Sequence, residues 1–202
     1  MKGRKNKKNH FVIVGIRNCR RLAHHCQHKK QLTIGTLFCG FILLFFFSSA
    51  GAEHTCKDSI ISTAPFTGFA LYSNGTATDQ TTGLMWMRCS LGQKWDDNTC
   101  SGTAASASWA DSLNTAADFE FAGYADWRLP NKNELESIVE GRCFSPAINA
   151  DVFPATPPDY FWSSSPYAAV SHAAWSVDFG YGTVIASIKS GSIHIRLVRD
   201  IE

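Results

Sequence analysis

Few side chains beyond residue 52 have the types and spacing that catalysis requires. Spacing identifies no catalytic partner for His54, His172 or His194. The serines at 163–165 lack the G-x-S-x-G sequence that exposes a nucleophile in many hydrolases. We therefore expect these serines to hydrogen-bond a strand end, and we predict no catalytic residue.

The cysteines beyond residue 52 indicate disulfides. Four remain, an even number, as disulfide pairing requires. Cys89 and Cys100 enclose a polar loop that a local bridge would close, which leaves Cys56 to pair with Cys143. A metal site is the alternative, but this part of the chain has no CxxC pair and only three histidines. We expect the bridges Cys89–Cys100 and Cys56–Cys143, and neither a metal nor another cofactor.

Charged residues offer two further candidates for chemistry. Asp126 and Arg128 flank Trp127 in a compact connector, and we expect them to form a structural ion pair around its ring; a catalytic role is the alternative. Asp151 and Asp178 carry oxygen ligands that suit calcium. We expect both side chains to be solvated carboxylates without a metal.

The first 52 residues differ in composition from the rest of the chain. They hold ten Lys or Arg and no Asp or Glu, whereas residues 53–202 hold nine basic and seventeen acidic residues, hence nine minus seventeen, or −8. A basic stretch at 2–31, an apolar run at 32–47 and small residues at 48–52 have the order of a secretory signal. We predict cleavage after Ala52 and a secreted or periplasmic product. An uncleaved membrane anchor is the alternative.

Short strands and turns begin after a polar lead-in at 53–65, and the folded domain is expected at 66–202. Asn74-Gly75 predicts a tight hairpin turn, because this pair readily adopts the positive φ of such turns. Apolar alternation at 173–179, 183–189 and 193–199 predicts a C-terminal β-meander.

Two helices are predicted between these strands. Ser108 caps the first, and Asn131 caps the second with Glu134 at the capping-box position. Gly141 is expected to end the second helix. The predicted fold class is α+β, with two helices packed on a twisted antiparallel sheet.

Alternation along the meander also predicts a binding surface. Trp175, Val177 and Phe179 are expected to point into the core, so the intervening residues face solvent. Loops beside them supply side chains that can stack on a ligand. The predicted ligand-binding residues are Tyr167, His172, Ser176, Asp178, Tyr181, Thr183, Ser187 and Lys189.

Four separated motifs resemble the Lcl C-terminal domain family, named for the C-terminal domain of a bacterial collagen-like adhesin. They are TATD at 76–79 with TGLMW at 82–86, GYADWRLPN at 123–131 with EL at 134–135, FWSSS at 161–165, and RLVR at 196–199. The resemblance covers about residues 66–200 and implies a C-type-lectin-like fold, similar also to formylglycine-generating enzymes. The named adhesin is a trimer that binds sulfated glycans; its collagen repeats are absent here. The motifs look like determinants of the fold, and no catalytic residues come with them.

The function that we predict is a secreted, extracytoplasmic ligand-binding module, with a carbohydrate or a protein as its partner. Export and the charge of −8 exclude nucleic acid. A basic patch in the last strands would suit an acidic glycan; its members are Lys189, His194, Arg196 and Arg199. The alternatives are a hydrolase or oxidase with an unrecognised site, and a structural surface subunit. An oxidase resembling formylglycine-generating enzymes would need reactive cysteines later in the chain than Cys143.

Overall fold

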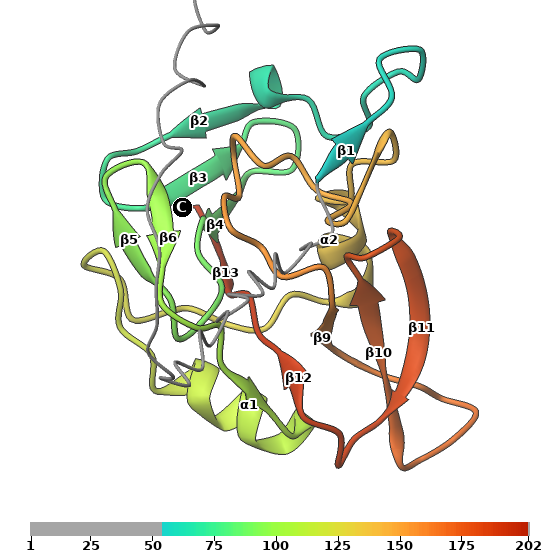
Figure 1. Cartoon of the computed structure of the whole chain (residues 1–202). Coiled ribbons are helices and arrows are strands. Elements are labelled where there is room, and N and C mark those ends of the chain that lie inside the picture. Colours follow the sequence, from blue (N-terminus) through green and yellow to red (C-terminus); the bar gives the residue numbers. More distant parts are fainter. Residues whose placement is uncertain (1–53, 202) are drawn as a thin grey trace, which may run out of the picture. The chain divides into compact units, whose positions relative to one another are not determined.

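The structure, a computed structural model, describes residues 54–201. The predicted signal segment and its cleavage site lie outside these residues, so cleavage after Ala52 stays a prediction. Residues 54–201 form an α+β domain with two α-helices and mostly antiparallel sheets, as predicted (Figure 1). In this part of the chain, no helix has the length and apolar character needed to cross a membrane.

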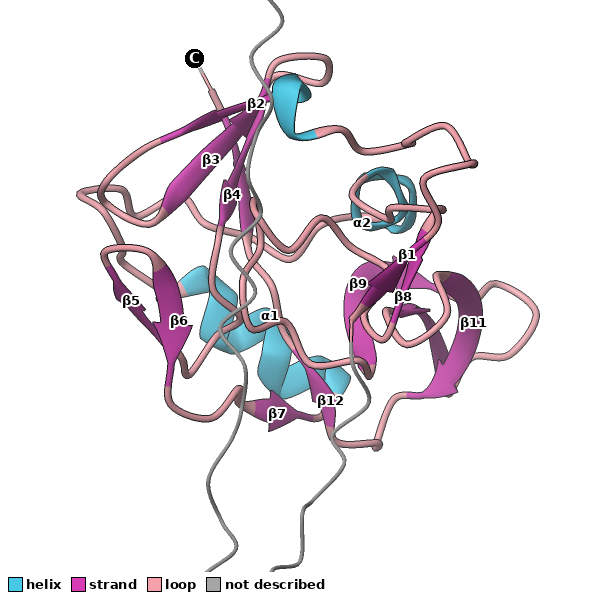
Figure 2. Ribbon diagram, turned by 45° about the horizontal axis from the view of Figure 1, so that its top comes forward, coloured by secondary structure: helices cyan, strands magenta, loops and turns pink. Residues whose placement is uncertain are grey.

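The larger sheet has the strand order β11-β10-β9-β12-β7, of which Figure 1 labels the first four strands. Its strands are β7 Ser106–Ala107, β9 Tyr160–Pro166, β10 Ala173–Asp178, β11 Thr183–Ile188 and β12 Ile193–His194. Strands β9, β10 and β11 form an antiparallel meander, whereas β12 pairs in parallel with β9 and antiparallel with β7, beside which it lies in Figure 2.

The predicted C-terminal meander is therefore wrong in its third strand. Residues 193–200 contain two separate strands, β12 and β13 (Val198–Asp200), and β13 joins the second sheet, whose order is β13-β4-β3-β2. Alternation identifies a strand but not its neighbour, and this segment crosses between sheets instead of turning back beside β11. The other members of the second sheet are β2 Phe69–Leu71, β3 Thr76–Asp79 and β4 Leu84–Met87.

Short elements complete the domain. The pair β1 (Thr55–Cys56) and β8 (Cys143–Phe144) and the hairpin β5 (Lys94–Asp96) and β6 (Thr99–Ser101) are two-stranded. A single 3-10 turn, Phe66–Gly68, precedes β2. Both predicted disulfides are confirmed: Cys56–Cys143 joins β1 to β8, and Cys89–Cys100 closes the loop around β5.

Both helices begin where the sequence predicts. The Ser108 side chain accepts a hydrogen bond from the Asp111 amide at the start of α1 (Trp109–Ala117). Asn131 and Glu134 form the predicted capping box of α2 (Lys132–Ser137). The second helix is shorter than expected and ends at Ser137, although Ile138 still packs in the core.

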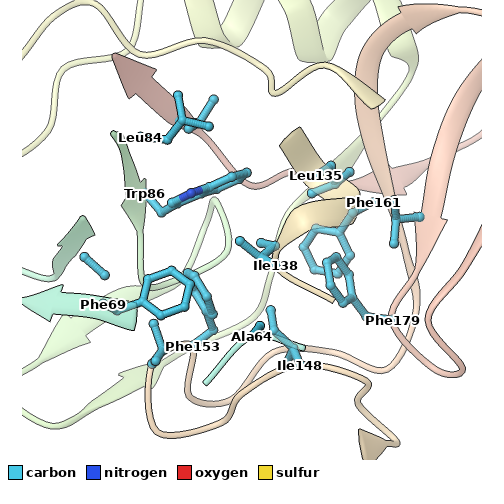
Figure 3. Packing of buried hydrophobic residues seen from close by; sticks show 14 residues of the cluster. Ala64, Phe69, Leu84, Trp86, Leu135, Ile138, Ile148, Phe153, Phe161 and Phe179 are labelled. Carbon is cyan, nitrogen blue, oxygen red and sulfur yellow. The ribbon is translucent and has the colours of Figure 1, made fainter. Parts of the chain in front are cut away.

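Two apolar clusters cover opposite faces of the larger sheet. Phe161 and Trp162 are neighbours on β9, so their side chains point to opposite faces. Phe161 packs with Leu135 and Ile138 of the α2 region and with Phe179 (Figure 3). Trp162 packs in the second cluster, against which residues of α1 also lie. Strand β10 is consequently covered on both faces along most of its length, with Ala174 in the second cluster and Val177 in the first, but Trp175 is only half-buried.

Candidate ligand-binding surface

The eight predicted ligand-binding residues do not form one surface. Tyr167, His172 and Lys189 lie at one end of the β10–β11 hairpin, and Tyr181 and Thr183 lie at the other. Six strand residues separate these ends by about 20 Å, because a strand rises roughly 3.3 Å per residue. One small ligand cannot contact both ends.

The prediction that Ser176 and Asp178 face solvent is wrong. Ser176 is 1% exposed, and its hydroxyl lies 2.8 Å from that of Ser187 on the next strand. The Asp178 Oδ1 atom accepts a hydrogen bond of 2.7 Å from the Gly180 amide, which stabilises the β10–β11 turn. The alternation agrees with the strand register, but at β10 the face that it assigned to solvent is covered by the second apolar cluster. On β11, Thr183 and Ile185 of the same face are exposed, as predicted.

The predicted basic patch is also wrong. Arg196 is fully buried, although it was expected to face outward. Arg199 is buried as well, lies over the ring of Tyr124 and contacts the carboxylate of Asp126. These two guanidinium groups therefore stabilise the interior.

Lys189 has local contacts of its own. Its Nζ atom donates to the Ser171 carbonyl at 2.8 Å and lies 4.4 Å from the centre of the Trp109 ring. The ammonium group therefore holds the β9–β10 connection against α1, and any ligand would compete with these contacts.

A partly exposed aromatic pair lies on the face of β10 opposite that of Ser176. Trp175, expected in the core, is only half-buried. Tyr167 packs edge-on against it, with ring centres 4.8 Å apart. Lys132 Nζ lies 5.9 Å from the Trp175 ring centre and pairs with Glu136 at 3.3 Å. We call these four residues, Trp175, Tyr167, Lys132 and Glu136, the Trp175 platform.

The serine motif at 163–165 holds this platform in place. Ser163 donates its hydroxyl hydrogen to the Trp175 carbonyl at 2.8 Å. Ser165 accepts a hydrogen bond of 3.0 Å from the amide of Lys132, at the first position of α2. The expectation that these serines bond a strand end is wrong: Ser163 bonds the interior of β10, at the register shift between Ala174 and Ser176, and Ser165 bonds the start of a helix. The platform residues on β10 and α2 are thereby fixed relative to each other.

Charged pairs elsewhere differ from the predicted one. Asp126 pairs with Arg199 at 2.7 Å, whereas Arg128 pairs with Glu134 at 2.8 Å and with Asp200 at 3.1 Å. Asp126 and Arg128 therefore do not pair with each other, because Asp126 pairs with Arg199 and Arg128 pairs with Glu134 and Asp200. The hydrogen bond that Arg199 donates to Asp126 lowers the pKa of Asp126, and the hydrogen bond that Arg128 donates to Glu134 raises the pKa of Arg128. The Asp126–Arg199 and Arg128–Asp200 pairs connect the GYADWRLPN motif to β13.

A small pocket of about 220 Å³ lies beside the Cys56–Cys143 disulfide. Its lining includes His54, Glu140 and Asp151. Ligand atoms of His54, Cys56 and Cys143 lie within 4.8 Å of one another. The two sulfur atoms are bonded to each other, however, and a metal binds the thiolate form of cysteine. This residue set therefore does not fit a metal ion.

Trp175, Lys132 and Glu136 were not predicted from the sequence. Alternation placed Trp175 with Val177 on an apolar face, and that face is indeed buried at Val177. One sequence signal was available: Ala186, the cross-strand neighbour of Trp175, is too small to cover an indole ring. Whether another element covers the ring depends on the tertiary structure.

The fold and this surface together define a disulfide-linked α+β domain that presents aromatic and charged side chains on a rigid sheet. The sequence model of the Lcl C-terminal domain matches residues 75–199, more than half of the chain. The chain belongs to this family, which indicates a binding or adhesion module as the class of function. A search of curated proteins found no match.

Proposed function

We propose that this protein is an exported ligand-binding module that holds a carbohydrate on the Trp175 platform. The observation that carries the proposal is the half-buried Trp175 ring with Tyr167 edge-on beside it. Aromatic side chains bind ligands by presenting a large apolar area at little cost in conformational entropy. A pyranose ring has an apolar C–H face that matches an indole in size.

The charged residues of the platform suit the sugar hydroxyls. Lys132 donates hydrogen bonds and Glu136 accepts them, and a hydroxyl group does both. Their side chains are partly exposed, which leaves both groups accessible to a ligand. Opposite charges 3.3 Å apart favour a neutral sugar over a polyanion, in agreement with the −8 charge of residues 53–202.

Two further features support export and the fold relationship. Both disulfides require an oxidising compartment, such as the periplasm or the cell exterior. A C-type-lectin-like fold, which the family resemblance implies, would place ligand-binding residues on a sheet and its loops. Trp175 on β10 and Tyr167 after β9 have this arrangement, and Lys132 and Glu136 reach the same surface from α2.

A glycan array tests the proposal. The full chain is expressed with its own signal, purified from the periplasm or the medium, and screened with and without calcium. We expect binding to neutral glycans, and Trp175→Ala should weaken it at least about tenfold, the equivalent of roughly 1.4 kcal/mol. Because Trp175 is half-buried, the domain should stay folded, which far-UV circular dichroism checks.

Tyr181→Ala is the matched control, because Tyr181 is 79% exposed at the opposite end of the hairpin. It should leave affinity unchanged. If Tyr181→Ala weakens binding and Trp175→Ala does not, the ligand binds at the hairpin turn. If Trp175→Ala unfolds the domain, Tyr167→Ala removes the edge-on ring and replaces it as the test variant.

A further inference from the structure

Strand β11 is an unusual sheet edge. Among residues 54–201, no strand pairs with its outer side. It is six residues long, whereas the edge strands β7, β2 and β13 have two or three. Proteins commonly protect sheet edges with short strands, charges, prolines or bulges. Thr183–Ile188 contains no charge and no proline, and its register with β10 is continuous.

The outward hydrogen-bonding groups of β11 can be assigned from the register. The Lys189 amide donates to the His172 carbonyl at 2.9 Å, which makes this a hydrogen-bonded pair. Such pairs alternate along an antiparallel ladder, so Ser187, Ile185 and Thr183 bond toward β10. The main-chain groups of the three intervening residues point to the open edge; these are Val184, Ala186 and Ile188.

The side chains of β11 are complementary to a second copy of the same strand. With Ala186 opposite its own equivalent in an antiparallel pair, Val184 lies opposite Ile188 of the second copy. Ile185 then lies opposite Ser187 of the second copy, and no like charges meet. The pairing would cover Ile188, which is 62% exposed, and Ile185, which is 36% exposed.

We propose that this protein dimerises by antiparallel pairing of β11 with β11 of a second copy, centred on Ala186. Two five-stranded sheets become one continuous sheet. The three outward residues of each copy form hydrogen-bonded pairs, which contribute about four to six main-chain hydrogen bonds, since the Ile188 carbonyl already accepts from the Gly191 amide at 2.8 Å. Main-chain pairing of this kind supplies affinity at sheet edges, and facing side chains supply register.

The dimer also determines how the Trp175 platforms of the two copies lie relative to each other. The use of this arrangement for binding rests on the proposed function. Trp175 is the cross-strand neighbour of Ala186, so a two-fold axis through Ala186 places both platforms on the same face of the sheet. Three strand spacings separate the two β10 strands, about 14 Å. Two platforms at this separation would bind a repeating glycan with avidity.

Sedimentation equilibrium of the exported protein tests the dimer without any ligand. The wild-type protein should be a dimer. Ala186→Lys and Ala186→Glu place like charges directly opposite each other, so each should raise the dissociation constant at least about tenfold. A mixture of the two variants should restore a dimer, because opposite charges then meet at the axis.

Ala110→Lys, an exposed alanine in α1, is the control and should remain dimeric. Far-UV circular dichroism establishes that each variant is folded. A monomeric wild-type protein at all accessible concentrations would overturn the proposal, as would a dimer that Ala186→Lys leaves intact. Folded variants whose mixture stays monomeric would overturn the register centred on Ala186. None of these outcomes depends on glycan binding.

Discussion

Two buried charged residues join separate segments of this domain through hydrogen bonds. Arg196 is fully buried and donates to the Met87 and Arg88 carbonyls at 2.9 and 2.6 Å and to Thr156 Oγ1 at 2.7 Å. The ring of Phe153 lies 4.8 Å from its guanidinium group. Burial lowers the pKa of Arg196 to about 9, which still leaves it charged at neutral pH. Carbonyl dipoles and aromatic rings stabilise this charge in place of a carboxylate.

Glu140 is the acidic counterpart. It is fully buried and accepts hydrogen bonds from the Ser62 hydroxyl and from the amides of Thr63, Ala64 and Arg142. Burial opposes its ionisation, but these hydrogen bonds outweigh burial and lower its pKa. The carboxylate thereby fastens the lead-in segment to the end of the α2 region.

Glu140→Gln should destabilise the domain in a pH-dependent way. At pH 7 we expect a loss of about 1–3 kcal/mol in the free energy of unfolding, because charge-assisted hydrogen bonds are lost. The folded pKa lies below the ordinary 4.5, so the contribution is present above that value and lost as the pH falls through the folded pKa. Urea unfolding from pH 7 to pH 3 should show the difference between variant and wild type shrinking. Glu120→Gln, at an exposed position, is the control; a difference that does not change with pH would contradict this account.

At the scale of elements, the family motifs act together at the start of α2. Asn131 Oδ1 accepts from the amides of Asn133 and Glu134, and the Glu134 carboxylate accepts from the Asn131 amide. Ser165 of the FWSSS motif binds the remaining amide of this first turn, that of Lys132. A helix of six residues is too short to be stable alone, so these caps and its packing on β9 and β10 determine that it forms.

Asn131→Ala should test the importance of this cap. We expect a loss of about 1 kcal/mol or somewhat more in the free energy of unfolding, because two helix amides lose their acceptor. Chemical denaturation at neutral pH measures it. Asn114→Ala, an exposed position inside α1, should change stability little or increase it slightly, since alanine favours helix interiors. An equal loss in both variants would mean that the Asn131 cap is not specific.

At the scale of the whole molecule, the two disulfides stabilise different parts of the domain. Cys56–Cys143 spans 87 residues and ties the lead-in to the middle of the chain, whereas Cys89–Cys100 spans 11. Closing the longer loop removes more entropy from the unfolded chain, with contributions of roughly 3–5 kcal/mol each in the simplest treatment. The longer bridge begins four residues after the predicted cleavage site, so it holds the N-terminal end of the described domain.

Export should release a chain that begins at Glu53. Cleavage after Ala52 follows from the small-residue sequence Ala50-Gly51-Ala52, which fits the narrow pocket of signal peptidase. Intact mass spectrometry of protein from the periplasm or the medium measures the N-terminus. A membrane-bound product that retains residues 45–47 would show that the segment is an anchor.

The sequence alone determined the features that depend on neighbouring residues. Helix starts were predictable because a cap bonds amides two or three residues away, as at Ser108 and Asn131. Strand alternation was predictable because it depends only on the pleat of the chain. The disulfides followed from the even number of cysteines and the loop between Cys89 and Cys100, and the family followed from four ordered motifs.

Only the tertiary structure decided which faces are open. Ser176 and Asp178 are polar yet buried, because a second apolar cluster covers their face of the sheet. Arg196 is buried because the chain crosses between two sheets at that point. Trp175 is partly open because its neighbouring strand is an edge and Ala186 is small. Such exposure depends on which distant segments pack nearby, and alternation along one strand carries no information about them.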